Sequence, residues 1–287
     1  MLALMLVLDL PHRASPHIST SLDTALIALE RIAPLELAES WDNVGLLVEA
    51  PGERRLRAIH LTIDLNEAVL AEAVATRSNL IVAYHPPIFA PLKHLLLGAD
   101  RQGVLLAAIT EGISIYSPHT ALDAVDGGVT EWLAGGLGEG KLQCSRPAGS
   151  EPTNSSAPGP GRLLELATAS TLTDLLMRIK AHLQLDTLRV AATREHQEGK
   201  AISRIGICPG AGASVLAASG AELYLTGEMR HHDLLAALDA GSSVILCEHS
   251  SSERGYLPVL RKRLMEELGG EVEVMVSSQD QEPLSYR

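Results

Sequence analysis

The sequence predicts an α/β fold built from two related lobes that face one another. Three observations support this prediction: short β-rich runs alternate with helix-like segments, 46% of the 287 residues are hydrophobic, and a Pro-, Gly- and Ser-rich stretch divides the chain. Alternation of strands and helices is typical of layered α/β proteins whose strands are partly parallel. At roughly 150 residues per domain, two domains are expected, with one large α/β unit as the alternative.

The first half of the chain is expected to contain three strands separated by helices. Runs rich in Ile, Val, Leu and Tyr predict strands at 59–63, 80–84 and 113–116. Helical composition predicts helices at 66–77 and 101–111, with Asn66 and Asp100 as N-caps.

The second half repeats this alternation after a break. Residues 146–161 (RPAGSEPTNSSAPGPG) cannot bury apolar surface, so we predict a linker or exposed loop there. The predicted lobes are therefore residues 1–145 and 162–287. Strands are predicted at 188–192, 202–207, 222–225 and 244–247, and helices at 172–182, 231–240 and 255–268.

Charge and composition exclude some classes of function. The formal net charge is −12, and aromatic residues make up only 3% of the chain. An acidic surface repels phosphate backbones, and few aromatic rings are available for base stacking. We therefore expect no nucleic-acid binding as the main activity.

The cysteines and the start of the chain bear on location. Three scattered cysteines without a CxxC pair argue against a disulfide framework and favour a reducing compartment. The apolar residues 1–10 lack the basic segment and cleavage site of a secretory signal and are too short to cross a bilayer. We expect a cytoplasmic protein without a membrane partner.

Histidine and acidic side chains follow five of the predicted strands. In open α/β sheets, ligands bind in the crevice beyond the carboxyl ends of the strands. We therefore expect these side chains to gather at one edge. They are Asp64, His85, His119 with Asp123, Glu228 with His231 and His232, and His249 with Glu253.

Two His–carboxylate pairs share a four-residue spacing, His119 with Asp123 and His249 with Glu253. This spacing lets both side chains of a pair point the same way in a helix or tight turn. Imidazole with carboxylate suits Zn, Mn, Fe, Co or Ni, and the absence of thiolates argues against a closed structural zinc site. A helix cap or a surface pair is the alternative for either pair alone. The recurrence of the pair, together with His85 held by two prolines, favours a metal site.

Three other segments have both a structural and a functional interpretation. The glycine-rich segment 206–214 is interpreted as an ordinary strand-to-helix turn, with phosphate contact as the less favoured alternative. Lys93 and His94 could meet an anionic substrate, although Lys93 is equally a solvated loop cation. Asp42 and Asn43 are expected to bond local backbone.

Five segments together resemble the NIF-three family (NGG-one-interacting factor three-like proteins, also labelled GTP cyclohydrolase I type 2 homologues). They occur in family order across nearly the whole chain, and their sequences are similar to those of the branch that includes the animal members. The resemblance implies two similar interlocking α/β lobes with mixed sheets, a metal site between them, and a ring-shaped homo-hexamer. The segments are WDNVGL at 41–46, YHPPIF at 84–89, SPHTALD at 117–123, GEMRHHD at 227–233 and CEHSSSERG at 247–255.

The resemblance also implies a set of site residues. Glu253 would bridge two metals, and many bacterial members have a second histidine where this chain has Tyr84. A phenol ligates most divalent metals only when deprotonated, so the second metal would bind weakly, use His119 or water, or be absent. The implied metal ligands are His85, Asp123, His249 and Glu253, with His119, His231 and His232 near them.

We predict a divalent-metal-dependent, GTP cyclohydrolase-like hydrolase of a nucleotide-like or phosphorylated small molecule, with one or two metals per chain. His119 or His232 would transfer the proton, since an unperturbed histidine titrates near neutral pH. The alternative is a non-catalytic metal-bearing scaffold or regulatory interaction protein, which the Tyr84 replacement favours. A third alternative is an α/β protein whose strand-end histidines have no metal role.

Overall fold

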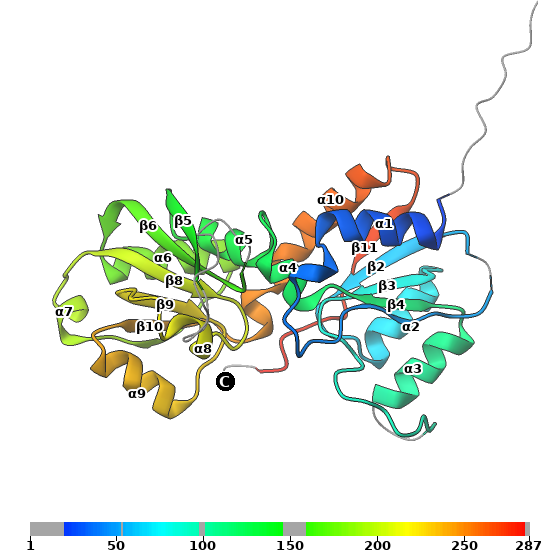
Figure 1. Ribbon diagram of the computed structural model, residues 1–287, viewed down its shortest axis with the longest axis horizontal. Helices are drawn as coiled ribbons and strands as arrows, with labels where there is room; N and C mark the ends of the chain where they lie inside the picture. Colours follow the sequence, from blue (N-terminus) through cyan, green and yellow to red (C-terminus); the bar gives the residue numbers. More distant parts are fainter. Residues whose placement is uncertain (1–19, 53, 98–100, 146–158, 285–287) are drawn as a thin grey trace, which may run out of the picture.

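The computed structural model describes residues 20–52, 54–97, 101–145 and 159–284, which form two lobes side by side (Figure 1). Each lobe is built around one mixed β-sheet with helices on both faces, so the predicted α/β fold is confirmed. No helix in the described ranges combines the length and apolarity needed to cross a bilayer. Residues 1–10, Asp100 and most of the predicted linker lie outside the described residues.

The first lobe contains a five-stranded sheet. Strands β2, β3 and β4 are buried along their whole length, which explains their unbroken apolar sequences. All neighbours are parallel except β1 and β4. In spatial order the strands are β1 (Gly45–Val48), β4 (Ser114–Ser117), β3 (Leu80–Ala83), β2 (Ala58–Thr62) and β11 (Glu273–Val276).

Helices cover both faces of this sheet (Figure 1). On one face, Leu80 and Val82 pack in a core with helices α1 (Leu22–Ile32) and α10 (Leu257–Glu267). On the other face, the alternate residues Ile81 and Ala83 pack with α2 (Glu67–Ala75) and α3 (Arg101–Thr110). Alternation of this kind follows from the two-residue period of a strand. The predicted N-cap of α2 is confirmed, because the Asn66 side chain accepts from the Val69 amide.

The second lobe contains a six-stranded sheet. Strands β8, β9 and β10 are parallel, and the outer neighbours are antiparallel. One core lies under α5 and α6, and another lies under α8 and α9. In spatial order the strands are β5 (Gly140–Ser145), β6 (Gly161–Ser170), β8 (Ile202–Cys208), β9 (Leu223–Thr226), β10 (Ser243–Leu246) and β7 (Arg189–Ala191). The helices are α5 (Val129–Gly135), α6 (Leu172–Leu183), α7 (Arg194–Gln197), α8 (Ala213–Leu216) and α9 (His231–Asp239).

Strand β5 lies in the sheet of the second lobe, and strand β11 lies in the sheet of the first lobe. The two sheets therefore do not follow the predicted division at 146–161. Strand β5 pairs with β6 across 146–158, which places both flanks of the predicted linker in the same sheet. After α10 the chain returns to the first lobe, where β11 pairs with β2. Figure 1 shows α10 and β11, near the C-terminus, beside α1. As a division into domains, 1–145 and 162–287 stays a prediction.

Candidate functional site

The carboxyl ends of strands from both sheets face one pocket of about 570 Å³. Parallel neighbours place their carboxyl ends at the same edge of a sheet, and here two such edges oppose each other. The crevice expected from the sequence is therefore observed. Its polar lining residues from strand ends include Asp64 after β2, His85 after β3, His119 and Asp123 after β4, and His249 and Glu253 after β10.

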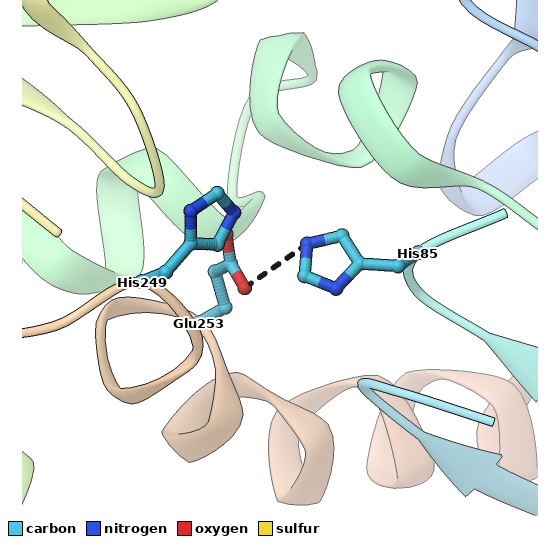
Figure 2. A group of neighbouring side chains, drawn as sticks. All are labelled: His85, His249 and Glu253. Atoms are coloured by element: carbon cyan, nitrogen blue, oxygen red, sulfur yellow. Dashed lines mark ion pairs between the residues drawn. The ribbon is translucent and has the colours of Figure 1, made fainter. Parts of the chain in front are cut away.

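His85, His249 and Glu253 form a compact group that could hold a metal ion (Figure 2). One ligand atom from each residue lies within 4.8 Å of the others. Glu253 lies between the two imidazoles, with Oε2 3.4 Å from Nε2 of His85 and Oε1 3.5 Å from Nε2 of His249. His249 and Glu253 thus point the same way, as their four-residue spacing predicts. They flank the short 3₁₀ helix η2 (Ser250–Ser252).

Two buried atoms of this group make no hydrogen bond and have only a long ion-pair contact with each other, at 3.4 Å. They are Nε2 of His85 and Oε2 of Glu253, which face each other. Buried polar atoms are normally hydrogen-bonded, so such a pair requires an explanation. Two imidazoles and a carboxylate are ligands that divalent first-row ions prefer. The residues present therefore fit a divalent metal.

Each histidine of the group is oriented by a carboxylate on its other ring nitrogen. Nδ1 of His85 lies 3.1 Å from Oδ1 of Asp64, and Nδ1 of His249 lies 3.0 Å from Oε1 of Glu228. Metal-binding histidines typically have such a partner, which fixes the ring and the tautomer. Burial alone lowers the pKa of His85, but the hydrogen bond to Asp64 and the ion pair with Glu253 outweigh it and raise the pKa to about 10. In both residues Nε2 is the atom left to face the pocket.

The loop after β10 and a glycine after β8 bring the second-lobe ligands together. Glu248 adopts a left-handed conformation (φ +66°) and pairs with Arg189, which turns the chain sharply before His249. Gly210 (φ +58°) approaches so closely that a Cβ there would lie 2.9 Å from Oε1 of Glu253 and 3.0 Å from Nε2 of His249. The glycine-rich segment 206–214 is thus a strand-to-helix turn, as favoured from the sequence, and it also packs directly on the metal group.

Asp123 lies in the same pocket but outside the three-residue group. It belongs to the short helix α4 (His119–Ala124), and its Oδ1 accepts a 2.5 Å hydrogen bond from the Tyr84 hydroxyl. Burial raises the pKa of Asp123 to about 7, the Tyr84 bond opposes this shift, and the charge of Glu253 adds to it. Burial also raises the pKa of Tyr84 well above its usual value, so the phenol is a hydrogen-bond donor here.

His119 is held by an acidic partner that the sequence did not assign to it. Its Nδ1 lies 2.8 Å from Oδ1 of Asp42, whose carboxylate also accepts from the Thr120 amide and hydroxyl. Burial alone raises the pKa of Asp42, but these hydrogen bonds lower it. The expected local bond is present, from the Asn43 amide to Asp42. That expectation missed the longer-range bonds, because nothing in the local pattern indicates a partner 77 residues away.

The remaining sequence candidates lie away from the group. His231 and His232 are exposed at the start of α9, and neither lines the pocket. Lys93 and His94 are likewise exposed and do not line it. Among the described lining residues there is no Lys or Arg, whereas five carboxylates line the pocket. The pocket therefore favours cations.

The last described segment, 277–284, runs between the two lobes (Figure 1), and its residues Glu282 and Pro283 line the pocket. Oδ2 of Asp280 accepts from the Ile63 amide of the first lobe at 2.6 Å and pairs with Nη1 of Arg254, next to Glu253, at 2.6 Å. The Glu282 carboxylate accepts hydrogen bonds from the hydroxyls of Ser250 and Ser251, in the loop that carries His249 and Glu253. This segment thus joins the chain near Asp64 to the chain near Glu253, which sequence spacing alone could not indicate.

Comparison with known proteins gives one consistent family. Residues 20–283 match the family described as Duf34/NIF3 (NGG1p interacting factor 3). The curated proteins to which the chain is similar include the following three. The NIF3 homolog of Schizosaccharomyces pombe is 42% identical over 90% of this chain and 95% of its own length. NIF3-like protein 1 of Drosophila melanogaster is 39% identical over 89% and 86%. NGG1-interacting factor 3 of Saccharomyces cerevisiae is 34% identical over 92% and 96%.

The fold is also found among solved structures. A Bacillus cereus protein related to NIF3 superposes with a TM-score of 0.80 at 18% identity, over 94% of this chain and all of that one. Identity this low supports the shared fold and no more.

Proposed function

Since this chain belongs to the Duf34/NIF3 (NGG1p interacting factor 3) family, we propose that it is a divalent-metal-dependent hydrolase of a small molecule. One observation carries the proposal: Nε2 of His85 in one lobe and Oε2 of Glu253 in the other face each other at 3.4 Å without a hydrogen bond, and His249 completes the group. The substrate classes to test are nucleotide-like compounds and phosphoesters. A GTP cyclohydrolase-like reaction falls within the first class.

His85, His249 and Glu253 would hold the metal, and Asp123 would be a fourth ligand from the wall of the pocket. A divalent ion held there supplies Lewis acidity, which activates water for hydrolysis near neutral pH. Zn, Mn, Fe, Co and Ni all suit the donor set. Tyr84 stands where many bacterial members of the family have a second histidine that would serve a second metal. Its hydroxyl is bonded to Asp123. We therefore propose one tightly held metal per chain, with a second as the weaker site.

His119 is the better of the two proposed proton carriers. It lines the pocket, and Asp42 bonded to Nδ1 leaves Nε2 of a neutral ring free to accept a proton. Its backbone is held in the left-handed region at φ +30°, a conformation that persists only where surrounding bonds enforce it. His232 is exposed on α9 and outside the pocket lining, so the geometry favours His119.

The experiment is a turnover screen of the metal-loaded protein against nucleosides, GTP and general phosphoester substrates. The matched variant is Asp123→Ala, which removes a proposed ligand, and His232→Ala is the control for a histidine outside the pocket. We expect turnover that is lost in Asp123→Ala and retained in His232→Ala. Turnover that survives Asp123→Ala, or none at full metal loading, contradicts the hydrolase proposal.

A second candidate is a metal-bearing protein that acts by binding another protein. The relative in Saccharomyces cerevisiae is named as an interacting factor of NGG1, which is a protein partner. In that case the metal would join the lobes or copies of the chain without turnover. None of the three cysteines is in a disulfide, which supports a reducing, cytoplasmic location for either function. The resemblance supports a homo-oligomer, with the hexamer as the form to test by light scattering.

A further inference from the structure

Two exposed aromatic rings stand at the edge of the metal pocket. Trp41 is 58% exposed and Phe89 is 57% exposed, and both line the pocket. The chain contains only one Phe and two Trp. Exposed rings of this size leave apolar surface in water, which is unfavourable unless a ligand covers it. Because the two rings lie beside the group of His85, His249 and Glu253, a ligand bound in the pocket would cover them.

The two rings are held in position by polar bonds beneath them. The Asn43 side chain donates a 2.6 Å bond to the Ile88 carbonyl, which ties the Trp41 turn to the Phe89 loop. Asp42, next to Trp41, is bonded to His119 and Thr120. The ring centroids of Trp41 and Phe89 lie 5.9 Å apart at an interplanar angle of 54°. A surface fixed before binding loses little conformational entropy when a ligand arrives.

Charge limits what this surface can bind. No Lys or Arg lines the pocket among the described residues, whereas Glu39, Asp64 and Glu282 join Asp123 and Glu253 on its walls. A metal held by His85, His249 and Glu253 would offset only part of this negative charge, and a polyphosphate would meet the remaining carboxylates without a Lys or Arg to pair with. A ring with little net charge meets no such opposition.

We propose that Trp41 and Phe89 form a subsite for a planar heteroaromatic ring, such as a nucleobase or nucleoside, that carries no polyphosphate. The proposal rests on the proposed metal-dependent function, since it places the ring beside the metal group. Aromatic rings stack on planar bases through their π-faces, and His119 lies edge-on to Trp41 at 6.0 Å. A pocket of about 570 Å³ is of the size that small ligands occupy.

The test is isothermal titration calorimetry of the metal-loaded full chain with guanosine, GTP and ribose 5-phosphate. Guanosine presents the ring without phosphate, and ribose 5-phosphate presents phosphate without the ring. The variants are Trp41→Ala, Trp41→Phe, which keeps an aromatic face, and Met177→Ala, an exposed apolar truncation on α6 outside the pocket. Metal content is measured on every sample.

We expect guanosine to bind and ribose 5-phosphate not to bind. Trp41→Ala should weaken guanosine binding by about ten-fold or more, while Trp41→Phe and Met177→Ala keep most of the affinity. Guanosine binding unchanged in Trp41→Ala overturns the proposal, as does ribose 5-phosphate or GTP binding more tightly than guanosine. A lower oligomeric state of Trp41→Ala by light scattering, with guanosine binding intact, would assign the rings to contact between copies and also overturn it.

The metal measurement separates this proposal from the proposed function. Full metal loading without guanosine binding rejects the ring subsite alone. Absence of metal in the wild-type protein rejects the proposed metal function, and guanosine binding that still depends on Trp41 would leave the ring subsite supported.

Discussion

Nε2 of His85 lies 3.4 Å from Oε2 of Glu253, although His85 follows a strand of the first sheet and Glu253 follows a strand of the second. The candidate metal group is therefore complete only when the two lobes are docked. A ligand that binds the folded state and not the unfolded state stabilises the fold by mass action. Metal binding and docking of the lobes should accordingly be coupled.

Replacing Tyr84 by Phe should destabilise the protein. The Tyr84 hydroxyl bonds the buried Asp123 carboxylate, and a hydrogen bond to a charged group contributes about 1.5–3 kcal/mol. The matched control is Tyr116→Phe, because the Tyr116 hydroxyl is buried with no hydrogen-bond partner. Urea unfolding at pH 8 should show a lower free energy of unfolding for Tyr84→Phe and little change for Tyr116→Phe. Equal losses in both variants would contradict this account of the Tyr84–Asp123 bond.

Replacing Gly210 by Ala should weaken metal binding. The added Cβ would press on Glu253 and His249, at 2.9 Å and 3.0 Å from their ligand atoms. Gly269→Ala is the control, since its φ of +63° gives similar backbone strain with nothing within 4 Å of the added Cβ. Displaced ligands should lower the affinity for Zn²⁺ about ten-fold or more in Gly210→Ala only. Calorimetric titrations that give the same affinity for both variants would argue against this packing role.

Replacing Asp280 by Ala should loosen the connection between the lobes. The buried Asp280 carboxylate joins Arg254 to the Ile63 amide, and removal of one member of a buried ion pair costs about 3–5 kcal/mol. Glu198→Ala removes an exposed pair with Arg194, for which about 0.3–0.5 kcal/mol is expected. Thermal or urea unfolding should show a larger loss of stability for Asp280→Ala than for Glu198→Ala. A loss for Asp280→Ala as small as that for Glu198→Ala would show that the segment 277–284 adds little.

Glu72 should make stability depend on pH in the acid range. Burial alone raises the pKa of its carboxyl, but hydrogen bonds from Ser277 and Ser278 and the bond to His60 lower it to about 2. The folded-state pKa lies below the ordinary 4.5, so this contribution is present above pH 4.5 and is lost as the pH falls towards 2.

The Glu72→Gln variant tests this dependence. The stability difference between wild type and Glu72→Gln should be larger at pH 6 than at pH 3, as measured by urea unfolding at both pH values. Glu67→Gln, an exposed position on the same helix, should give a small difference at both. A Glu72→Gln difference that does not shrink in acid would refute the assignment.

Much of the fold was predictable because its central strands are continuous apolar runs. Strands such as 80–83 and 244–246 are buried on both faces, and their runs of apolar residues indicate that burial. Strands β1, β5, β6 and β11 were missed, since their mixed sequences take their structure from pairing with other strands of the fold. The placement of β5 in the second sheet and of β11 in the first sheet was missed for the same reason.

The ligand group was predictable to the extent that local signals specify it. The strand-end position of His85 and the spacing of His249 and Glu253 were visible in the sequence. Asp64 and Glu228, which orient the two imidazoles, were also among the strand-end residues. Other contacts of the site come from elsewhere in the chain. Asp42 reaches His119, and Asp280 connects Ile63 to Arg254, through contacts that only the folded chain creates. Long-range bonds of this kind leave no periodic or local signal.

Metal content of untagged protein tests the central claim most directly. The measurement is elemental analysis and calorimetric titration with Zn²⁺ and Mn²⁺ of wild type, Glu253→Gln and Glu39→Gln, the last being a pocket carboxylate outside the group. We predict at least one divalent ion per wild-type chain, near-complete loss in Glu253→Gln and retention in Glu39→Gln. A wild-type chain that binds no divalent ion, or a Glu253→Gln variant that binds as the wild type does, would contradict the claim.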